Sequence, residues 1–334
     1  MENNTLTAVP GLRVGHFTHI PGATGVTVVI CPPGTVGGVD QRGGAPGTRE
    51  TDLLRPVHLV ETVNAVVLSG GSAYGLASAD GVMRYCEDHD IGYLSGTGFL
   101  VPIVPAAILM DLPVGERGIR PDAAMGYAAC EAATTDPVEQ GTVGAGTGCR
   151  IGAFRGNERA TKGGIGTAAI DLGDGLVVAA LVAVNAVGDV VEPDGTIFAG
   201  VRLEEGRGFV GMMNLLHEMV RVTQRPNPPL PMGTDPITTG SDSATVIGVV
   251  ATNAKLNKEQ ANKVAQMAQN GVAMAVRPAH TMFDGDTMFA LATGEIEANV
   301  NTIGAFAAEV TAAAIRNGVK AATSLAGVRA WNDW

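Results

Sequence analysis

The sequence predicts an α/β fold, and three observations lead to that prediction. Apolar segments rich in Val and Ile alternate along the chain with segments of helical periodicity. Hydrophobic residues make up 46% of the 334 residues and charged residues only 16%, which is typical of a large packed core and not of a disordered chain. The 46 glycines and the low aromatic content of 4% indicate close packing of elements built from Val, Ala, Leu and Ile.

The first expected elements are two strands and a helix. Residues 25–31 and 64–68 are short runs rich in Val and Ile, a pattern that favours buried strands. Between them, residues 32–51 contain many Gly, Pro and charged residues, so we expect a long loop, and loops of this length are often functional. Ser72 is expected to open a helix that runs to about Asp88, because its apolar residues fall on one face.

The middle of the chain should add two helices and a strand pair. Residues 121–133 are expected to form the first helix, with a proline in its first turn. Residues 163–171 and 176–185 are apolar runs separated by a Gly-Asp-Gly turn, which is the pattern of a hairpin. Residues 208–222 are expected to form the second helix.

A connector rich in Pro and Gly, residues 225–244, separates these elements from the C-terminal part. After it we expect a strand over residues 245–252, a helix over 258–275, an edge or bent strand over 281–292 and a long final helix over 296–322. Because the strand after the connector is strongly apolar, the sequence predicts a single domain over residues 1–334 with an exposed loop inside it.

Charge and targeting features argue against several classes of partner. The formal net charge of −11 disfavours nucleic acids and anionic membranes. The start of the chain is polar and acidic, without the pattern of a secretory signal, and the longest apolar stretches are too short to span a bilayer. The four cysteines are far apart in the sequence, so we expect no disulfide or zinc framework and a reducing, cytoplasmic location.

No metal or other cofactor is expected. His16 and His19 are close in sequence, but no cluster of carboxylates or cysteines accompanies them. Residues 69–75 lie between a strand and a helix, as a phosphate loop or a nucleophile elbow does. They lack G-x-G-x-x-G, however, and Tyr74 interrupts G-x-S-x-G. This segment fits a tight turn with close packing, or the wall of an active site.

The main lead to function is the threonine that opens the strand after the connector. A threonine hydroxyl is a poor nucleophile without an adjacent base. A cut just before Thr245 would create an α-amino group with a reference pKa of about 7.7–8.0, which could serve as that base. The small Ala244, the flexible residues 238–243 before it and the strand after it suit such a cut. The alternative is that Thr245 merely starts a strand, where β-branched residues are favoured.

A pair of carboxylates lies further along the chain. Asp284 and Asp286 flank a glycine, and Phe283 and Phe289 on either side indicate partial burial. Buried carboxylates need a cationic partner, which a new ammonium group at Thr245 would supply. The pair would then hold the threonine in place. The alternative is a solvated Asp-Gly turn.

Two further polar residues occur in glycine-rich or apolar surroundings. Lys162 precedes two glycines that allow close approach of the backbone, although most lysines are solvated. Asn185 ends the apolar run 179–184, and a buried amide there must be hydrogen-bonded. It could cap the end of the strand or donate a hydrogen bond to an oxyanion.

Five segments, taken together, resemble one family, and they cover nearly the whole chain in order. They are Gly11-Leu12-Arg13-Val14-Gly15-His16, Leu68-Ser69-Gly70-Gly71-Ser72-Ala73-Tyr74-Gly75-Leu76, Lys162-Gly163-Gly164-Ile165-Gly166, Ala183-Val184-Asn185-Ala186 and Phe283-Asp284-Gly285-Asp286. This combination resembles the nylon-oligomer hydrolase and L-aminopeptidase D-Ala-esterase/amidase family of self-processing N-terminal-nucleophile hydrolases. The resemblance implies a four-layer α/β/β/α fold that matures into an α chain, residues 1–244, and a β chain, residues 245–334.

The resemblance also implies roles for individual residues. The chain would cut itself between Ala244 and Thr245, and Oγ1 of Thr245 would attack the substrate. Asp284 and Asp286 would orient this hydroxyl, and Asn185 and Lys162 would assist at the oxyanion and the nucleophile. The residues expected to line the substrate site are Tyr127, Ser72 and Tyr74.

The sequence also departs from the family pattern before the nucleophile. Ala244 stands where Asn is typical of the nylon-oligomer branch and Gly of the aminopeptidase branch. The Thr nucleophile with an Asp pair is closer to the nylon-oligomer branch, because the aminopeptidase branch resembles Ser with Ser and Glu.

The function expected from the sequence is therefore hydrolysis of short linear amides, such as peptides or ω-amino-acid oligomers, through a Thr245 acyl-enzyme. The resemblance also implies a homo-oligomer of processed α/β units. One alternative is an aminopeptidase or D-Ala-esterase acting on small N-terminal residues. Another is an acyltransferase on a related self-processing fold, in which an amine replaces water. A third is a non-enzymatic domain that binds a small molecule at residues 69–75, which would not be cut into two chains.

Overall fold

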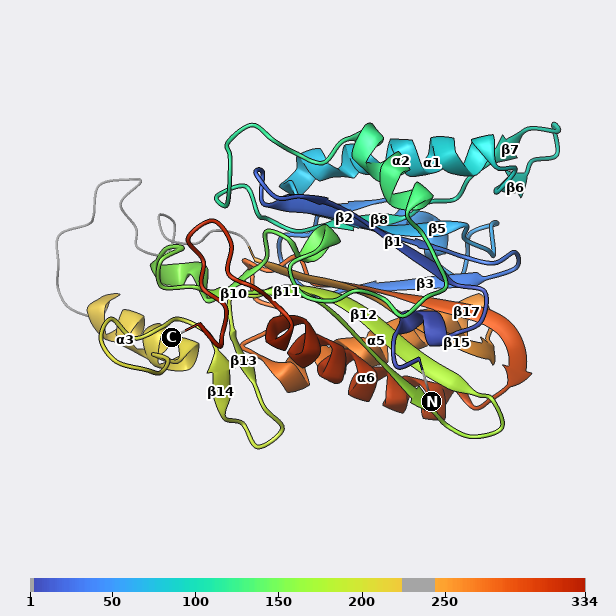
Figure 1. The fold of residues 1–334 in the computed structure, drawn as a ribbon. Helices are drawn as coiled ribbons and strands as arrows, with labels where there is room; N and C mark the ends of the chain where they lie inside the picture. Colours follow the sequence, from blue (N-terminus) through green and yellow to red (C-terminus); the bar gives the residue numbers. More distant parts are fainter. Residues whose placement is uncertain (1–2, 224–243, 334) are drawn as a thin grey trace.

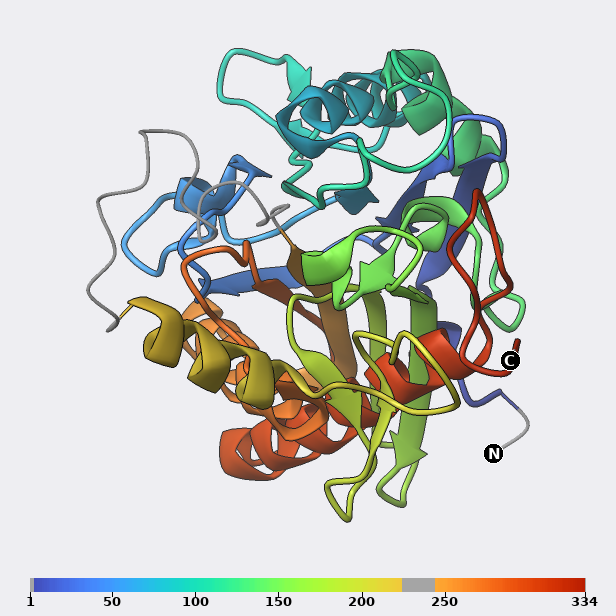
Figure 2. The ribbon, with the colours of Figure 1, turned by 90° about the vertical axis from the view of Figure 1, so that its left-hand side faces the viewer.

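The computed structural model describes residues 3–223 and 244–333, and these residues form four layers (Figure 1). Two helices cover one face of a five-stranded sheet, and a second five-stranded sheet packs against the other face. Two long helices cover the outer face of the second sheet. Figure 2 shows the same order of layers from the side, with the first helix pair at the top and the second at the bottom. This is the α/β/β/α order that the resemblance implies.

The first sheet has the strand order β1-β2-β5-β8-β4. Its strands are β1 (Arg13–His19), β2 (Thr24–Ile30), β4 (Thr48–Arg49), β5 (Ala65–Ser69) and β8 (Ala106–Ile108). Helices α1 (Ser78–Asp88) and α2 (Ala123–Glu131) cover it. The strands and helices expected in this part are confirmed, except that residues 72–77 form a short 3-10 helix before α1 begins.

The second sheet has the strand order β11-β12-β15-β17-β3. Its strands are β3 (Val36–Gln41), β11 (Gly164–Asp171), β12 (Val177–Asn185), β15 (Thr245–Lys255) and β17 (Thr287–Glu297). The helices that cover it are α5 (Lys258–Ala275) and α6 (Val300–Lys320). The expected hairpin is confirmed as β11 and β12, whose second strand pairs with β15. Strand β17 runs parallel to β15.

Smaller elements lie around these layers. They are β6 (Tyr93–Leu94), β7 (Leu100–Val101), β9 (Arg150–Ile151), β10 (Thr161–Lys162), β13 (Asp189–Val191), β14 (Ile197–Ala199), β16 (Val276–Arg277) and α3 (Met212–Thr223). Lys162, one of the predicted site residues, lies on β10 and pairs in register with Arg150 on β9. Among the described residues, no helix combines the length and apolarity needed to cross a membrane.

Strand β15 contributes to two hydrophobic cores, because successive side chains of a strand point to opposite faces. Ile247 and Val249 belong to the core between the two sheets. Val246 and Val250 belong to the core between the second sheet and helices α5 and α6. The same alternation assigns Thr245, at the start of β15, to the face between the sheets.

The expected loop over residues 32–51 is wrong, because it contains β3 and β4. Strand β3 forms the edge of the second sheet and pairs with β17. Strand propensity does not predict β3, because it contains two glycines, which are unfavourable in strands. These glycines are needed for packing. A Cβ atom on Gly38 would lie 2.4 Å from the carbonyl carbon of Ala261 on α5. Close packing of a helix on a strand therefore decided what the local sequence did not.

The expected edge or bent strand over residues 281–292 is also wrong in place and start. Strand β17 begins at Thr287 and lies inside the sheet, between β15 and β3. The six residues before it form a loop that side-chain hydrogen bonds hold, described below. The expected final helix is confirmed as α6 with shorter ends. The connector lies outside the described residues except for Ala244.

Candidate active site

Thr245 begins β15 in the interior of the protein. Its side chain is buried, and it pairs in register with Asn185, the last residue of β12. The Oγ1 hydroxyl donates a hydrogen bond of 2.5 Å to the carbonyl oxygen of Ala244. The hydroxyl therefore lies against the carbonyl group of its own preceding peptide bond, the bond at which the resemblance led us to expect a cut.

The backbone N–H of Gly285 points at the same place. It donates to the carbonyl oxygen of Ala244 at 3.1 Å and also lies 3.3 Å from Oγ1 of Thr245. A glycine is required there, because an added Cβ would lie 3.0 Å from Oγ1 and 2.7 Å from the carbonyl oxygen of Ala45. An N–H aimed at a carbonyl oxygen is suited to stabilise the negative charge that develops there when a nucleophile attacks.

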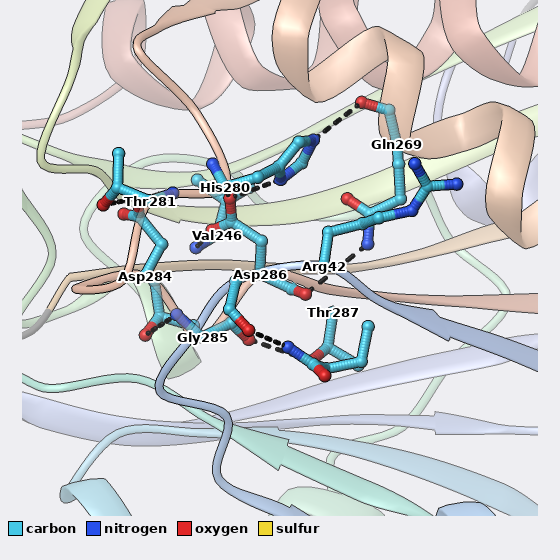
Figure 3. Close-up of polar contacts among 12 residues, drawn as sticks. Arg42, Val246, Gln269, His280, Thr281, Asp284, Gly285, Asp286 and Thr287 are labelled. Atoms are coloured by element: carbon cyan, nitrogen blue, oxygen red, sulfur yellow. Dashed lines mark hydrogen bonds and ion pairs between the residues drawn. The ribbon is translucent and has the colours of Figure 1, made fainter.

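Asp286 holds the first residues of β15 through its carboxylate (Figure 3). Oδ1 accepts the backbone N–H of Val246 at 2.8 Å. Oδ2 accepts the backbone N–H of His280 at 3.0 Å and contacts the imidazole Nδ1 of His280 at 2.8 Å. Burial opposes the charged form of His280, but the hydrogen bond and charge of Asp286 outweigh it and raise the pKa of His280 above its ordinary value.

Asp284 lies on the other side of Gly285 and is held by Thr281 and by the backbone of Val187. Its Oδ2 accepts the backbone N–H of Thr281 at 2.8 Å and the hydroxyl of Thr281 at 2.5 Å. Burial, and then the charge of Asp286, raise the pKa of Asp284 above its ordinary value. Asp284 is also bridged through its backbone to Ala244. The solvated-turn alternative is therefore wrong, since both carboxylates are buried, at 2% and 1% exposed.

Among the residues that the structure describes, neither carboxylate hydrogen-bonds to Oγ1 of Thr245. They act on the threonine through its neighbours: Asp286 through the N–H of Val246, and Asp284 by shaping the loop that presents the N–H of Gly285. We refer to residues 278–286 as the carboxylate loop. The sequence did not single out His280, although a histidine close before two acidic residues was a signal for it.

A second set of buried polar side chains lies around Asn185, the last residue of β12. It consists of Lys162, Asn185 and Asp111, and we call it the lysine cluster. Lys162 is fully buried, and its Nζ donates to the carbonyl oxygens of Gly163 at 2.7 Å and Gly146 at 3.1 Å. Burial lowers the pKa of Lys162 to about 8, because the ammonium loses its hydration.

The other two members of the lysine cluster are bonded to backbone groups, and Asp111 also accepts the hydroxyl of Thr24 at 2.7 Å. The amide oxygen of Asn185 accepts the backbone N–H of Arg150 at 3.0 Å, and its Nδ2 donates to the carbonyl oxygen of Met110 at 3.0 Å. Asp111, next to Met110, is buried, and burial raises its pKa to about 6. The sequence missed Asp111, although an acidic residue directly after the apolar run 101–110 was a signal for it.

The segment of residues 69–75 adjoins the lysine cluster. The backbone N–H of Gly71 donates to Oδ1 of Asp111 at 2.7 Å. Ser72 has a left-handed backbone and donates its N–H to the carbonyl oxygen of Leu109. Tyr74 is 57% exposed, and the guanidinium of Arg120 lies 3.7 Å from the centre of its ring. A cavity of about 350 Å³ is lined by residues that include Asp111 and Arg120, both of which contact this segment.

The structure does not bring Tyr127 together with the other predicted residues through any described contact. It lies on α2, where its hydroxyl donates to Asp88 at 3.1 Å and its ring meets Tyr85 edge-on. A part in lining the substrate site stays a prediction for Tyr127, Ser72 and Tyr74. Within residues 3–223 and 244–333, no group of three or more His, Cys, Asp or Glu side chains could hold a metal ion.

Comparison with known proteins assigns the chain to a family. The model of peptidase family S58 matches residues 4–331. The chain belongs to peptidase family S58. Members of this family are peptidases or amidases, so the S58 chain is a hydrolase of amide bonds.

Two curated relatives of the S58 chain carry the names of different kinds of amide hydrolase. An uncharacterized aminopeptidase of Mycobacterium leprae is 44% identical over 356 aligned positions, covering 97% of this chain and 92% of the relative. A 6-aminohexanoate-oligomer endohydrolase of Paenarthrobacter ureafaciens is 28% identical over 317 positions, covering 90% of this chain and 82% of the relative.

Solved structures share the fold of the S58 chain. A β-aminopeptidase from Burkholderia sp. matches with a TM-score of 0.70 at 23% identity, over 99% of this chain and 91% of that one. The L-aminopeptidase D-Ala-esterase/amidase of Ochrobactrum anthropi, described as a variant of the Ntn hydrolase fold, matches with a TM-score of 0.68 at 20% identity, over 96% and 86%. The N-terminal-nucleophile fold expected from the five segments is therefore confirmed.

Proposed function

We propose that this S58 chain is a self-processing amide hydrolase. It cuts itself between Ala244 and Thr245, and the new N-terminal Thr245 hydrolyses short linear amides, such as peptides or ω-amino-acid oligomers. The observation that carries the proposal is the arrangement at the peptide bond before Thr245. Its carbonyl oxygen lies 2.5 Å from the Thr245 hydroxyl and accepts the N–H of Gly285 at 3.1 Å.

Self-cleavage follows as an N-to-O acyl shift. Oγ1 of Thr245 adds to the carbonyl carbon of Ala244 and closes a five-membered ring, and the N–H of Gly285 stabilises the oxyanion. The bond from Ala244 carbon to Thr245 nitrogen then breaks, and the hydroxyl proton ends on that nitrogen. Water hydrolyses the resulting ester, which restores the Thr245 hydroxyl and leaves a carboxylate on Ala244.

Substrate turnover repeats both steps of this chemistry, acyl transfer to Oγ1 and hydrolysis of the ester, on a separate amide. The free α-amino group of Thr245 accepts the Oγ1 proton as Oγ1 attacks the substrate carbonyl, and passes it to the leaving amine. Water then hydrolyses the acyl-enzyme. Asp286 fixes the start of β15 through Val246, which keeps the nucleophile in position. The buried cation of Lys162 and the amide of Asn185, whose residue pairs with Thr245, favour negative charge on this side of the site.

The relatives support amide hydrolysis and offer two forms of it. One is named an endohydrolase of 6-aminohexanoate oligomers, and others, with higher identity, are named uncharacterized aminopeptidases. An aminopeptidase acting on small N-terminal residues is therefore the second candidate, favoured by the 44% identity. Product analysis with and without an added amine separates both hydrolases from an acyltransferase.

The test compares two threonines of the same strand. Thr245→Val and Thr252→Val each remove one buried hydroxyl from β15 at almost constant volume, and the hydroxyl of Thr252 donates to Val177 far from the carboxylates. We expect the unaltered chain and Thr252→Val to yield two chains by intact mass, the smaller beginning Thr-Val-Ile-Gly-Val. Thr245→Val should remain one inactive chain. Full activity in an uncut chain, or cleavage of Thr245→Val, would overturn the proposal.

A further inference from the structure

A cavity of about 500 Å³ opens at one end of the first sheet, where β1 and β5 begin and β2 ends. Arg13 and Asn64 line it from these strand ends, and Asp90 lines it from the turn after α1. Binding sites for small molecules commonly have volumes of about 300–1,000 Å³. The cavity is therefore large enough to hold a small molecule.

The cavity is separate from the candidate active site. Strand β2 runs from the cavity to Thr24, whose hydroxyl donates to Asp111 of the lysine cluster at 2.7 Å. The seven residues of β2 span roughly 20 Å, at about 3.4 Å per residue. In Figure 1, β6, which follows the cavity residue Gly92, lies at the right, whereas β10, which carries Lys162, lies at the left. A ligand in the cavity would therefore not touch the residues around Thr245.

Arg13 is partly buried, yet its guanidinium has no acceptor among the described residues. Its charge acts on the thiols of Cys86 and Cys130, but burial raises the pKa of Cys86 to about 11 and also raises the pKa of Cys130, so neither thiol is an anion near neutral pH. Among the arginines whose burial the structure describes, every other one that is not exposed donates a side-chain hydrogen bond: Arg49, Arg150, Arg159, Arg202 and Arg316. The N–H donors of Arg13 are therefore available to an anionic ligand.

Three more residues that line the cavity have polar groups without a partner among the described residues. Asn64 accepts the backbone N–H of Ile103 at 2.8 Å with its amide oxygen, but its NH₂ group has no acceptor. The hydroxyl of Thr62 has no partner either, and the exposed carboxylate of Asp90 forms no ion pair. The cavity thus offers several donors for an anionic oxygen and one carboxylate for a cation.

We propose that this cavity, which we call the Arg13 cavity, binds a free α-amino acid as a second ligand site of the protein. The carboxylate of the amino acid would pair with the guanidinium of Arg13, and its ammonium group with the carboxylate of Asp90. Arg13 and Asp90 do not pair with each other, so both charges are available to one zwitterion. Asp90 disfavours inorganic phosphate, because like charges repel.

The proposed ligand belongs to the chemistry of the protein. A free amino acid is a product of peptide hydrolysis, and the chain belongs to a family of peptidases. The inference does not depend on self-cleavage, because none of the residues that it uses belongs to the carboxylate loop or to the lysine cluster.

Calorimetric titration of the unaltered protein with L-leucine tests the cavity, because leucine contains no amide bond to hydrolyse. The analogues 4-methylpentanoate and 3-methylbutylamine keep its side chain but lack the ammonium group and the carboxylate, respectively. We expect a Kd of about 1 mM for leucine, and binding at least about tenfold weaker for each analogue and for inorganic phosphate. No saturable binding of leucine at about 10 mM, or equal binding of an analogue or of phosphate, would overturn the proposal.

Variants of the two charged residues locate the binding. Arg13→Gln and Asp90→Asn should each weaken leucine binding by at least about tenfold. Arg84→Gln is the control for Arg13, because Arg84 is exposed and lies 3.9 Å from Asp88. Asp174→Asn is the control for Asp90, because both residues are exposed and have a left-handed backbone, which Asn accommodates. Since Asp90 is exposed, Asp90→Asn should fold even if Arg13→Gln does not, and parental affinity in Asp90→Asn would contradict the proposal.

Thr245→Val separates the Arg13 cavity from the catalytic site. In this chain, which the proposed function expects to remain uncut, Ala244 still accepts the N–H of Gly285. We expect leucine to bind it with the parental Kd. Loss of binding would assign leucine to the catalytic site and overturn the second site. Cleavage of Thr245→Val would overturn the proposed function, but parental binding of leucine would still support the Arg13 cavity.

Discussion

The carboxylate loop and the lysine cluster both adjoin the residues around Thr245, but they are built in opposite ways. In the loop, two carboxylates receive donors mostly from residues 280 and 281, a few positions away. In the lysine cluster, three segments distant in sequence bring together Lys162, Asn185 and Asp111, all buried. Lys162 finds carbonyl oxygens as its partners, and its pKa falls to about 8.

This difference suggests separate roles for the two regions, one in holding geometry and one in electrostatics. The carboxylates of the loop accept hydrogen bonds from nearby residues and so fix the geometry of the loop and of the start of β15. Among the described residues, the hydrogen bonds of the buried Lys162 ammonium go to two backbone carbonyls, so no hydrogen-bonded carboxylate neutralises its charge. We therefore expect variants of the lysine cluster to change electrostatics and variants of the loop to change position.

Lys162→Met should have the largest effect. Removing a group that stabilises an oxyanion commonly lowers kcat by about 10²–10³-fold, and we expect a loss in this range. Lys258→Met is the matched control, because Lys258 is also buried and its Nζ donates to the carbonyls of His58 at 2.9 Å and Val60 at 2.8 Å. If both variants lose stability equally and keep kcat, the charge of Lys162 has no part in the chemistry.

Asp111 should make folding depend on pH. Its folded pKa of about 6 lies above the unfolded value of about 3.9, so its contribution to stability is full below pH ~4 and is lost as the pH rises through 6. The difference corresponds to roughly 3 kcal/mol. In an uncut Thr245→Val background, urea unfolding from pH 4 to 7 should show this loss, and the loss should be smaller in Asp111→Asn, because Asp284 has a raised pKa as well.

The matched control for Asp111 is Asp174→Asn, in the exposed turn between β11 and β12. Its unfolding free energy should follow that of the parent at every pH. A parent curve that is flat between pH 4 and 6 would contradict the assignment of a raised pKa to Asp111.

Asp284→Asn and Asp286→Asn test the positional role of the loop. Each replaces one acceptor oxygen by an NH₂ group that faces a donor, so the loop should shift and kcat should fall by at least roughly tenfold, or about 1.4 kcal/mol. Asp189→Asn is the control, since Asp189 is a buried carboxylate that accepts the N–H of Met212 on α3. Near-parental kcat in both loop variants would show that the two carboxylates do not position the nucleophile.

His280→Gln should have the smallest effect and a recognisable pH signature. Asp286 raises the pKa of His280, so the charged pair stabilises the loop fully below pH ~6.5 and less as the pH rises through the folded pKa of His280. The gap in unfolding free energy between parent and variant, again in the uncut background, should therefore shrink with rising pH. A gap independent of pH would mean that His280 only fills space.

Local sequence sufficed where a signal is local. The Val- and Ile-rich runs of β2, β12 and β15 indicate strands, and the periodicity of residues 258–275 indicates α5. The two carboxylates around Gly285 could be noticed because they are adjacent in sequence. The five segments that resemble S58 proteins carried the fold and the reaction class, because they record a whole arrangement and not a propensity.

Tertiary structure decided what depends on neighbours distant in sequence. Strand β3 exists because β17 offers it a partner and Gly38 lets α5 approach, and neither fact can be read from residues 36–41. Asp111 and His280 joined the site through contacts that only the folded chain makes. The sequence alone thus determined the family and the pair of residues at the proposed cut. Only the fold set the 3.1 Å contact from the Gly285 N–H to the Ala244 carbonyl, because a hydrogen bond depends on placement in space.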